Sequence, residues 1–354
     1  MDIPVLQSVD RTSVLWNGSK YLFFGGYDYH RHSIHPEVIA AFQRASIDYG
    51  INSGGSLWTT GTHPLHRKLE SSICNFISVE AVALLPSCYL ANRSLIQYFL
   101  QNVYDIYYPE VSHPSLKPPV NTVCYSYSDL NILDINLKKS HKPLIIAESI
   151  INNGNSIAPI DQLIQQHSNV VCIIDDAHGI GVIGKTGRGI LEEAKVHHLN
   201  NLVTGSLSKG IGVFGGFIGG SKKWINKIKQ LSSVYQGSSS LPLPVCAAAI
   251  KSIQILKTNT KKIKNLRKNS ISFKENLLSG GIDIVISPTP VIAIKFENEN
   301  LIKDLKDNML KNGIFPSIIS YPGNLKGNLL RIAISSLHTQ EDLNNLSSVL
   351  LSSL

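Results

Sequence analysis

Short apolar runs alternate with amphipathic stretches along most of the first 260 residues, and this alternation limits the possible folds more than any other feature. The apolar runs, which we expect to be strands, cover 81–85, 105–108, 122–125, 144–147, 170–174, 202–204 and 217–219. The stretches that we expect to be helices include 35–49, 64–77, 91–101, 159–167 and 224–234. Strands alternating with helices predict an α/β fold, with a parallel, doubly wound sheet covered on both faces.

The pattern changes after residue 258, which indicates a second domain. A long basic helix is followed by expected strands at 282–286, 291–296 and 329–334, a helix at 301–311 and a last helix from Gln340. A chain of 354 residues is long enough for two domains. We therefore predict a short N-terminal segment (1–34) that packs with the small domain, a large domain (35–258) and a small α+β domain (259–354).

The formal net charge of +8 does not by itself indicate a nucleic-acid partner. Much of the excess falls between Lys251 and Lys268, with apolar residues at helical spacing, so we interpret it as one solvated helix face. No apolar run is long enough to span a bilayer, and no signal peptide is visible. The five scattered cysteines lack metal-ligand spacing. We expect a cytoplasmic protein without a metal, a nucleic-acid partner or a membrane partner.

Two residues that follow apolar strands indicate the chemistry. Lys209 lies on a turn rich in glycine and serine after the strand at 202–204, and Asp175 directly follows the strand at 170–174. Such a lysine can form a Schiff base with an aldehyde cofactor, and such an aspartate can keep a pyridine nitrogen protonated. His178 can reach the phenolic oxygen of the same ring. The pattern predicts a pyridoxal 5'-phosphate site, and the alternatives are a surface lysine and structural roles for Asp175 and His178.

Two further segments can complete this site. Ser87, Cys88 and Tyr89 join a strand to the start of a helix, where free backbone amides bind phosphate well. The alternative for Ser87 is a simple helix N-cap. His113 follows another strand and could stack on the cofactor ring.

Two glycine-rich motifs match nucleotide-binding patterns, but their surroundings do not. Residues 179–186 fit the Walker A pattern, whose Lys185 would open a helix that Gly187 and Gly189 would break. Residues 210–215 fit the dinucleotide fingerprint, but 216–220 are expected to form a strand instead of a helix. We therefore prefer the pyridoxal site to a P-loop or dinucleotide-binding protein.

The run Asp175–Gly189 resembles the signature of the α-oxoamine synthases, which are fold-type-I pyridoxal-phosphate transferases. Further matches lie at 53–56, 61–63, 69–70, 87–92, 113–115, 158–159, 206–209, 215–216, 331–332 and 338–339. The resemblance implies a large, mostly parallel sheet domain and a small C-terminal α+β domain. It also implies a homodimer with shared active sites.

The resemblance assigns a role to each matching residue. Lys209 would carry the cofactor and move the substrate α-proton, with Asp175, His178 and His113 as the other catalytic residues. The implied cofactor-binding residues are Ser87, Cys88, Tyr89, His113, Asn152, Asp175, His178, Ser206, Lys209 and, from the neighbouring subunit, Ser239. Arg331 would bind the substrate carboxylate through a bidentate pair, and Ser56 would also contact the substrate.

The implied activity is a decarboxylative, Claisen-type condensation. An amino acid and an acyl thioester of coenzyme A or a carrier protein would give an α-amino ketone. Within the family the first expectation is the 8-amino-7-oxononanoate synthase reaction of biotin synthesis, from L-alanine and a pimeloyl thioester. Glycine C-acetyltransferase, or another amino acid or acyl chain, is the alternative. A non-catalytic relative of the fold is the alternative from a different class.

The departures from the family pattern lie mainly on the substrate side. The run Gly25–His30 stands where the family has Ser-Asn-Asp-Tyr-Leu-Gly-Leu, so a substrate-contacting asparagine is replaced. Asn152–Asn155 replaces a run ending Ser-Met-Asp-Gly-Asp, and Leu57 stands where several members have arginine. The sequence also begins close to its first strand, where family members carry a helical arm.

Overall fold

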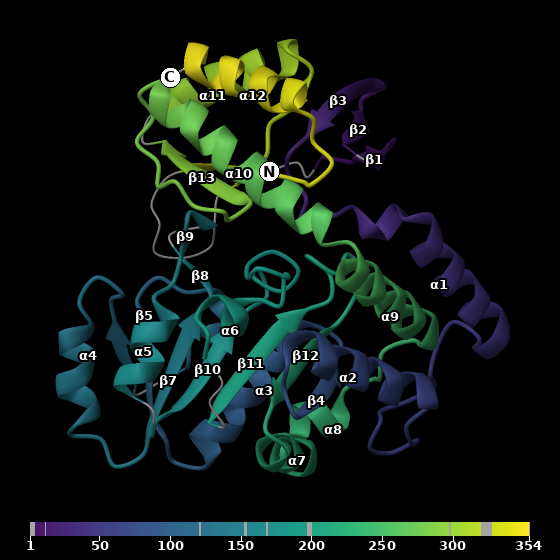
Figure 1. Cartoon of the computed structure of the whole chain (residues 1–354), viewed down its shortest axis with the longest axis vertical. Coiled ribbons are helices and arrows are strands. Elements are labelled where there is room, and N and C mark those ends of the chain that lie inside the picture. Colours follow the sequence, from purple (N-terminus) through teal and green to yellow (C-terminus); the bar gives the residue numbers. More distant parts are fainter. Residues whose placement is uncertain are drawn as a thin grey trace.

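The protein forms two lobes in the computed structural model, with a large sheet in one lobe and smaller sheets in the other (Figure 1). The structure describes residues 4–10, 12–119, 122–151, 154–167, 169–196, 200–296, 299–319 and 328–353. In the described part of the chain, no helix is both long and apolar enough to cross a membrane.

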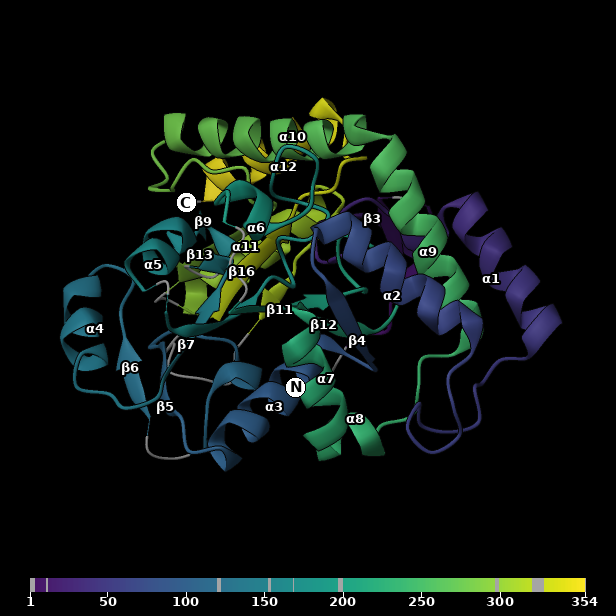
Figure 2. The same cartoon turned by 60° about the horizontal axis from the view of Figure 1, so that its bottom comes forward.

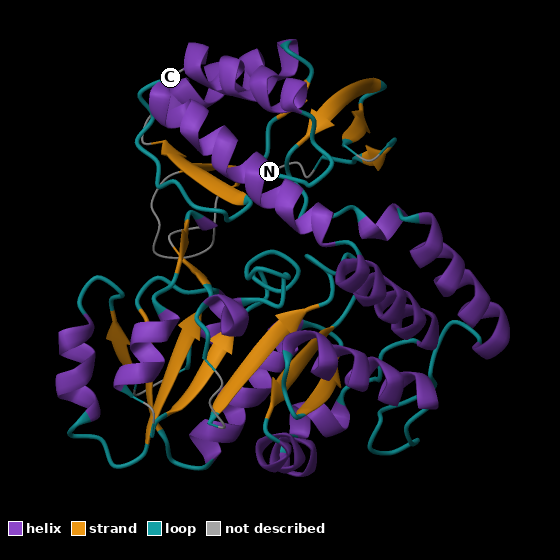
Figure 3. Cartoon of the chain, in the orientation of Figure 1, coloured by secondary structure: helices purple, strands orange, loops and turns teal. Residues whose placement is uncertain are grey.

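A seven-stranded sheet forms the centre of the large lobe (Figure 3). Its strand order is β4 (Ala81–Leu85), β12 (Gly216–Gly220), β11 (Asn201–Ser206), β10 (Val171–Asp175), β7 (Pro143–Glu148), β5 (Asp105–Pro109) and β6 (Val123–Tyr125). β12 pairs antiparallel with both neighbours, whereas the strands from β11 to β6 are parallel. The predicted fold class, a mostly parallel doubly wound sheet, is confirmed.

Both faces of this sheet are buried because its strands are apolar on both sides. In β7, Leu144 and Ile146 pack into one cluster, while Ile145 and Ala147 pack into the other. The first cluster includes side chains of α3 (Cys88–Gln101) and α7 (Lys222–Leu231). The second includes α2 (Pro64–Ile77), α4 (Leu130–Leu137), α5 (Ile160–Gln166) and α9 (Leu243–Thr258). Figure 2 shows these helices around the sheet. Two buried faces explain the near-continuous apolar runs in the sequence.

The chain between β3 and α10 also contains further elements. They are α1 (Pro36–Tyr49), α6 (Ile190–Glu193), α8 (Ser233–Gly237), the 3-10 turns η1 (His32–Ile34) and η2 (Pro114–Leu116), and the hairpin β8 (Ile150–Ile151) and β9 (Ser156–Ile157). Helix α1 packs along α9 and lies at the edge of the molecule (Figure 1).

The small lobe contains an antiparallel sheet and three helices. The sheet order is β13 (Val291–Phe296), β16 (Asn328–Ala333) and β15 (Ile318–Ile319), and the helices are α10 (Thr260–Ser279), α11 (Glu299–Lys311) and α12 (Gln340–Ser353). A second sheet joins β1 (Gln7–Ser8), β2 (Ser13–Trp16) and β3 (Ser19–Phe23) to β14 (Ile314–Phe315). The N-terminal strands thus pair with a strand of the C-terminal region. The proposed boundaries at 34 and 258 remain predictions.

Three local expectations were wrong. Residues 282–286 form no strand, since Val285 and Ile286 are exposed and Pro288 and Pro290, which lack the N–H that pairing needs, follow at once. The expected helix at 224–234 is two helices, because Ser232 caps a new one. The basic stretch is likewise divided between α9 and α10 at Asn259.

Candidate active site

Polar side chains from neighbouring parallel strands meet at the carboxyl edge of the large sheet. Glu148 ends β7, Asp175 ends β10 and Ser206 ends β11, and Asp175 lies in register with both Glu148 and Thr204. A cavity of about 540 Å³ opens at this edge. The small lobe contributes Val291, Ala293, Leu329 and Arg331 to its lining. The site therefore lies where ligands bind in open α/β sheets, between the two lobes.

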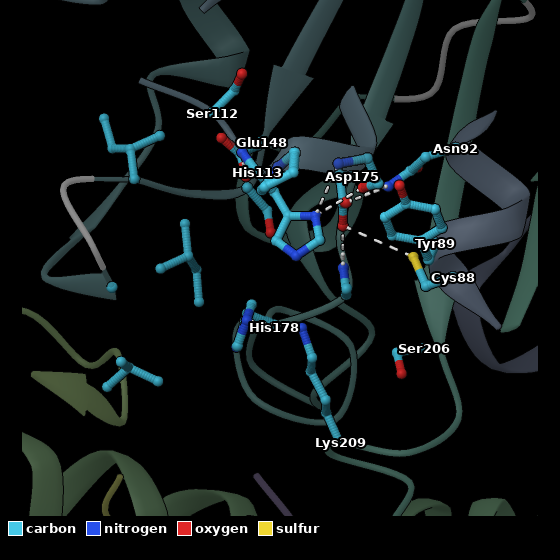
Figure 4. Close-up of a pocket in the computed structure, with 18 of the residues that line it drawn as sticks. Cys88, Tyr89, Asn92, Ser112, His113, Glu148, Asp175, His178, Ser206 and Lys209 are labelled. Atoms are coloured by element: carbon cyan, nitrogen blue, oxygen red, sulfur yellow. Dashed lines mark hydrogen bonds between the residues drawn. The ribbon is translucent and has the colours of Figure 1, made fainter. Parts of the chain in front are cut away.

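Lys209 and His178 are in direct contact on one side of the cavity (Figure 4). Lys209 Nζ lies 2.7 Å from His178 Nε2, and the hydroxyl of the buried Tyr29 lies 2.7 Å from His178 Nδ1. Their loops approach closely at Gly210, where a Cβ would lie 2.2 Å from the Ile180 carbonyl oxygen.

Burial lowers the pKa of the Lys209 amine, and the Asp175 carboxylate opposes this shift. Burial and the Lys209 charge also hold the pKa of His178 well below its usual range. His178 is therefore a neutral imidazole, and it lies beside an amine whose neutral form is favoured by burial.

Asp175 is held by a buried network centred on Asn92. The Asn92 amide donates to Asp175 Oδ2 at 2.6 Å and to Ser115 Oγ at 2.8 Å, while Thr204 Oγ1 donates to Asn92 Oδ1 at 2.6 Å. The backbone N–H of Ala177 donates to Asp175 Oδ1 at 2.9 Å. Among the residues that the structure describes, the hydrogen-bond donors to this carboxylate are neutral, so a bound cation would be its charged partner.

We expect Asn92→Ala to lower the free energy of unfolding of the apoprotein by about 2–3 kcal/mol. The substitution removes two buried hydrogen bonds and one half-buried bond. It leaves the Thr204 hydroxyl without its acceptor, whereas the Ser115 oxygen keeps its contact with His113 Nδ1. Urea unfolding measures the change. The control is Asn131→Ala, because Asn131 is exposed on α4 and should change stability by less than about 0.5 kcal/mol. Equal stability of the two variants would contradict the network.

The segments expected around a cofactor lie across the cavity from Lys209. Ser87 is the N-cap of α3, as one alternative predicted, because its Oγ accepts the Leu90 N–H. The first backbone N–H groups of a helix have no partner within the helix, so those at the start of α3 can bind a phosphate. β12 approaches this point so closely that a Cβ at Gly216 would lie 2.2 Å from the Cys88 nitrogen. The His113 ring accepts from the Ser115 N–H at Nδ1, and Figure 4 shows the ring near Asp175. Burial lowers the pKa of His113, which favours a neutral, stacking ring.

Glu148 is a half-buried acid of the site that the sequence motifs did not indicate. It lines the cavity beside Asp175. The backbone N–H of His113 donates to Glu148 Oε1, with 3.3 Å between the nitrogen and the oxygen. Burial, and then the charge of Asp175, raise the pKa of Glu148 to about 8. A signal was present, because Glu148 directly follows the apolar run 144–147 as Asp175 follows its own run.

We expect Glu148→Gln to remove part of the pH dependence of apoprotein stability. Folded Glu148 keeps its proton to about pH 8, whereas its unperturbed pKa is 4.5, so its contribution to stability is complete below pH 4.5 and is lost as the pH rises through 8. Urea unfolding at a series of pH values should show the wild type losing up to about 1.4 kcal/mol per pH unit more than the variant. Burial also raises the pKa of Asp176 to about 8. Asp176 is present in both proteins, so its contribution to the pH dependence cancels when their stabilities are subtracted. Parallel stability profiles would contradict this account.

The structure brings together most of the predicted site residues. Those that line the cavity are Ser87, Cys88, Tyr89, His113, Asp175, His178, Ser206, Lys209 and Arg331. Ser56 and Ser239 are not among the lining residues: Ser56 is buried against Thr59, and Ser239 is exposed. Asn152 lies outside the described residues. The catalytic and binding roles of all these residues remain predictions.

The structure around the two glycine-rich motifs is as predicted from the sequence and does not fit nucleotide binding. Lys185 is exposed on a loop, and the next helix, α6, begins only at Ile190. Residues 216–220 form strand β12 and no helix follows the fingerprint at 210–215 directly. Neither segment runs directly into a helix, as the phosphate-binding loop of a nucleotide site does.

Comparison with known proteins agrees with this geometry. The model of the family described as aminotransferase class I and II matches residues 22–350. The chain belongs to this family. It is similar to the 8-amino-7-oxononanoate synthase of Thermosipho melanesiensis, with 30% identity over 96% of this chain and 90% of that protein. It is also similar to 8-amino-7-oxononanoate synthase 1 of Bacillus subtilis, with 28% identity over 99% and 92% of the two chains.

A solved structure shows the same fold. A serine palmitoyltransferase with pyridoxal phosphate superposes with a TM-score of 0.92, at 23% identity, over 99% of this chain and 92% of that one. The predicted resemblance to the α-oxoamine synthases within the aminotransferase class I and II family is confirmed.

Proposed function

We propose that this member of the family is a pyridoxal-phosphate-dependent acyltransferase that makes an α-amino ketone by decarboxylative condensation. The observation that carries the proposal is that Lys209 and Asp175 line the same cavity at the carboxyl edge of the sheet. The prediction of an enzyme of this class, with pyridoxal phosphate as cofactor, is confirmed by the family and its relatives.

The residues present fit this cofactor. The Asp175 carboxylate would hold the protonated ring nitrogen, and the open amides at the start of α3 would hold the phosphate. Lys209 would hold the aldehyde carbon, with the neutral His178 at the phenolic oxygen and the His113 ring stacked on the cofactor. A cavity of about 540 Å³ leaves room for a substrate as well. When bound, the cofactor supplies an electron sink for a carbanion at the substrate α-carbon.

The protein's own groups perform the remaining tasks. The Lys209 amine, with its lowered pKa, removes and returns a proton at the substrate α-carbon. The Arg331 guanidinium lines the same cavity and binds the amino-acid carboxylate. The Asp175 carboxylate would lie beside the ring nitrogen, where its negative charge would stabilise the transition state for proton loss.

The substrates proposed are L-alanine and a pimeloyl thioester, as for an 8-amino-7-oxononanoate synthase. The support is the similarity to relatives of that name over nearly the whole chain. The test is to incubate the holoenzyme with L-alanine, glycine or L-serine, together with pimeloyl or acetyl thioesters, and to identify products by mass spectrometry. We expect 8-amino-7-oxononanoate from L-alanine and the pimeloyl thioester. A faster acetyl transfer to glycine would contradict this choice, and no product from any pair would contradict catalysis.

We further propose that two copies form the working enzyme. Exposed apolar side chains gather on α1 and the segment after it: Ile39, Phe42, Ile47, Tyr49, Ile51 and Trp58. Such a surface is typical of an interface. Ser239, exposed and outside the cavity of its own chain, would reach the phosphate in the partner's site. Light scattering of the purified protein should give the mass of a dimer.

We also keep the cytoplasm as the proposed location. The five cysteines Cys74, Cys88, Cys124, Cys172 and Cys246 are free thiols, which fits a reducing compartment. Fractionation of cells that produce the protein tests this proposal.

A further inference from the structure

Tyr27 occupies the position at which the family pattern has a substrate-contacting asparagine, just before Asp28 and Tyr29. It comes from the N-terminal segment, yet it lies against three residues that line the cavity: Arg331, Lys209 and His178. Tyr27 is not itself among the lining residues, and it is 39% exposed. The contacts of Tyr27 with these neighbours give it an indirect route to a ligand in the cavity.

The closest of these contacts is with Arg331. Arg331 Nη1 donates to the Tyr27 hydroxyl at 2.6 Å, and the guanidinium carbon lies 4.6 Å from the centre of the Tyr27 ring. The same ring lies 5.7 Å from Lys209 Nζ and 5.8 Å from the His178 ring. A short bond from a charged donor, together with a ring beside the guanidinium, fixes this long side chain in one orientation.

The remaining hydrogen-bond donors of Arg331 indicate which ligand this orientation favours. Arg331 Nε is buried, and it has no hydrogen-bond partner among the residues that the structure describes. A buried donor without a partner is unfavourable, so such a group is expected to meet a ligand. A guanidinium presents its donors as a planar fork that fits a carboxylate. Because Tyr27 engages Nη1, the Nε side of the fork stays free to receive a carboxylate.

We propose that Tyr27 is a positioning residue, which holds Arg331 so that its Nε side receives the α-carboxylate of the amino-acid substrate. This inference rests on the proposed function, since that function supplies the amino acid. The hydroxyl is the decisive group, because the ring alone would pack equally well without a bond to Nη1. Tyr27→Phe therefore separates positioning from packing. Because this side chain is partly exposed, the variant leaves no buried cavity.

The experiment compares two ligands of the holoenzyme that differ in the carboxylate. Titration with L-alanine or with ethylamine, which lacks the carboxylate, is followed through the visible absorbance of the cofactor. We expect Tyr27→Phe to bind L-alanine about tenfold more weakly, as for loss of one hydrogen bond to a charged group, and to bind ethylamine like the wild type. The KM for L-alanine should rise while the KM for the acyl thioester stays unchanged. Tyr21→Phe, in the same N-terminal segment on β3, is the matched control.

A double-mutant cycle tests whether the effect passes through Arg331. In an Arg331→Gln background, adding Tyr27→Phe should weaken L-alanine binding no further. Unchanged L-alanine affinity in Tyr27→Phe, equal losses for L-alanine and ethylamine, or a full additional loss in the Arg331→Gln background would each overturn the positioning role. A wild-type holoenzyme that responds to ethylamine but to no amino acid would instead contradict the proposed function, and the inference with it.

Discussion

Lys209→Ala is expected to lower turnover by about 10⁴-fold. The substitution removes both the amine that would hold the cofactor aldehyde and the group that would move the substrate α-proton. The open amides of α3 and the Asp175 carboxylate remain, so part of the cofactor affinity should persist. Product formation is measured by mass spectrometry, and cofactor retention by dialysis followed by release of the cofactor in acid.

Lys185→Ala is the matched control for this result. Lys185 is an exposed lysine on the glycine-rich loop, and it would be essential only in a P-loop protein. We expect its variant to keep nearly full activity. Near-normal turnover in Lys209→Ala, or a large loss in Lys185→Ala, would contradict the assignment of the reactive amine.

Asp175→Asn should slow loss of the substrate α-proton by about 10²- to 10³-fold while weakening cofactor binding much less. Asparagine is similar in size and can still accept the Ala177 N–H, but it carries no charge to keep the ring nitrogen protonated. The rate of deuterium exchange at the α-carbon of L-alanine, followed by NMR in heavy water, reports this step without the acyl donor.

Asp161→Asn, on the exposed first turn of α5, is the corresponding control and should exchange deuterium at the wild-type rate. Equal exchange rates in Asp175→Asn and the wild type would show that the carboxylate does not stabilise the carbanion. A complete loss of cofactor from Asp175→Asn would show that Asp175 acts mainly in binding.

The sequence was sufficient to predict features of the site that follow from local sequence patterns. Asp175 and Lys209 each follow an apolar strand, and parallel strands bring their carboxyl ends to one edge, so their proximity could be predicted. The same reasoning applied to Glu148, which also follows an apolar run. Its raised pKa could not be predicted, because it depends on burial of the carboxyl group in the fold and on the pairing of β7 with β10, which brings Asp175 beside it.

Features that depend on distant segments could not be predicted. Tyr27 and Arg331 are 304 residues apart, and nothing near either residue indicates their hydrogen bond. The Asn92 network likewise joins α3 to two strands and to η2. The wrong strand at 282–286 has the same origin, because an apolar run becomes a strand only where the fold supplies a partner strand.

The most direct test of the central claim is to locate the bond between protein and cofactor. The holoenzyme is reduced with borohydride and digested, and the peptides are sequenced by mass spectrometry. Covalent attachment of the reduced cofactor at Lys209, and its absence from Lys209→Ala, is the predicted result. Attachment at another lysine, or a holoenzyme in which no lysine carries the cofactor, would contradict it.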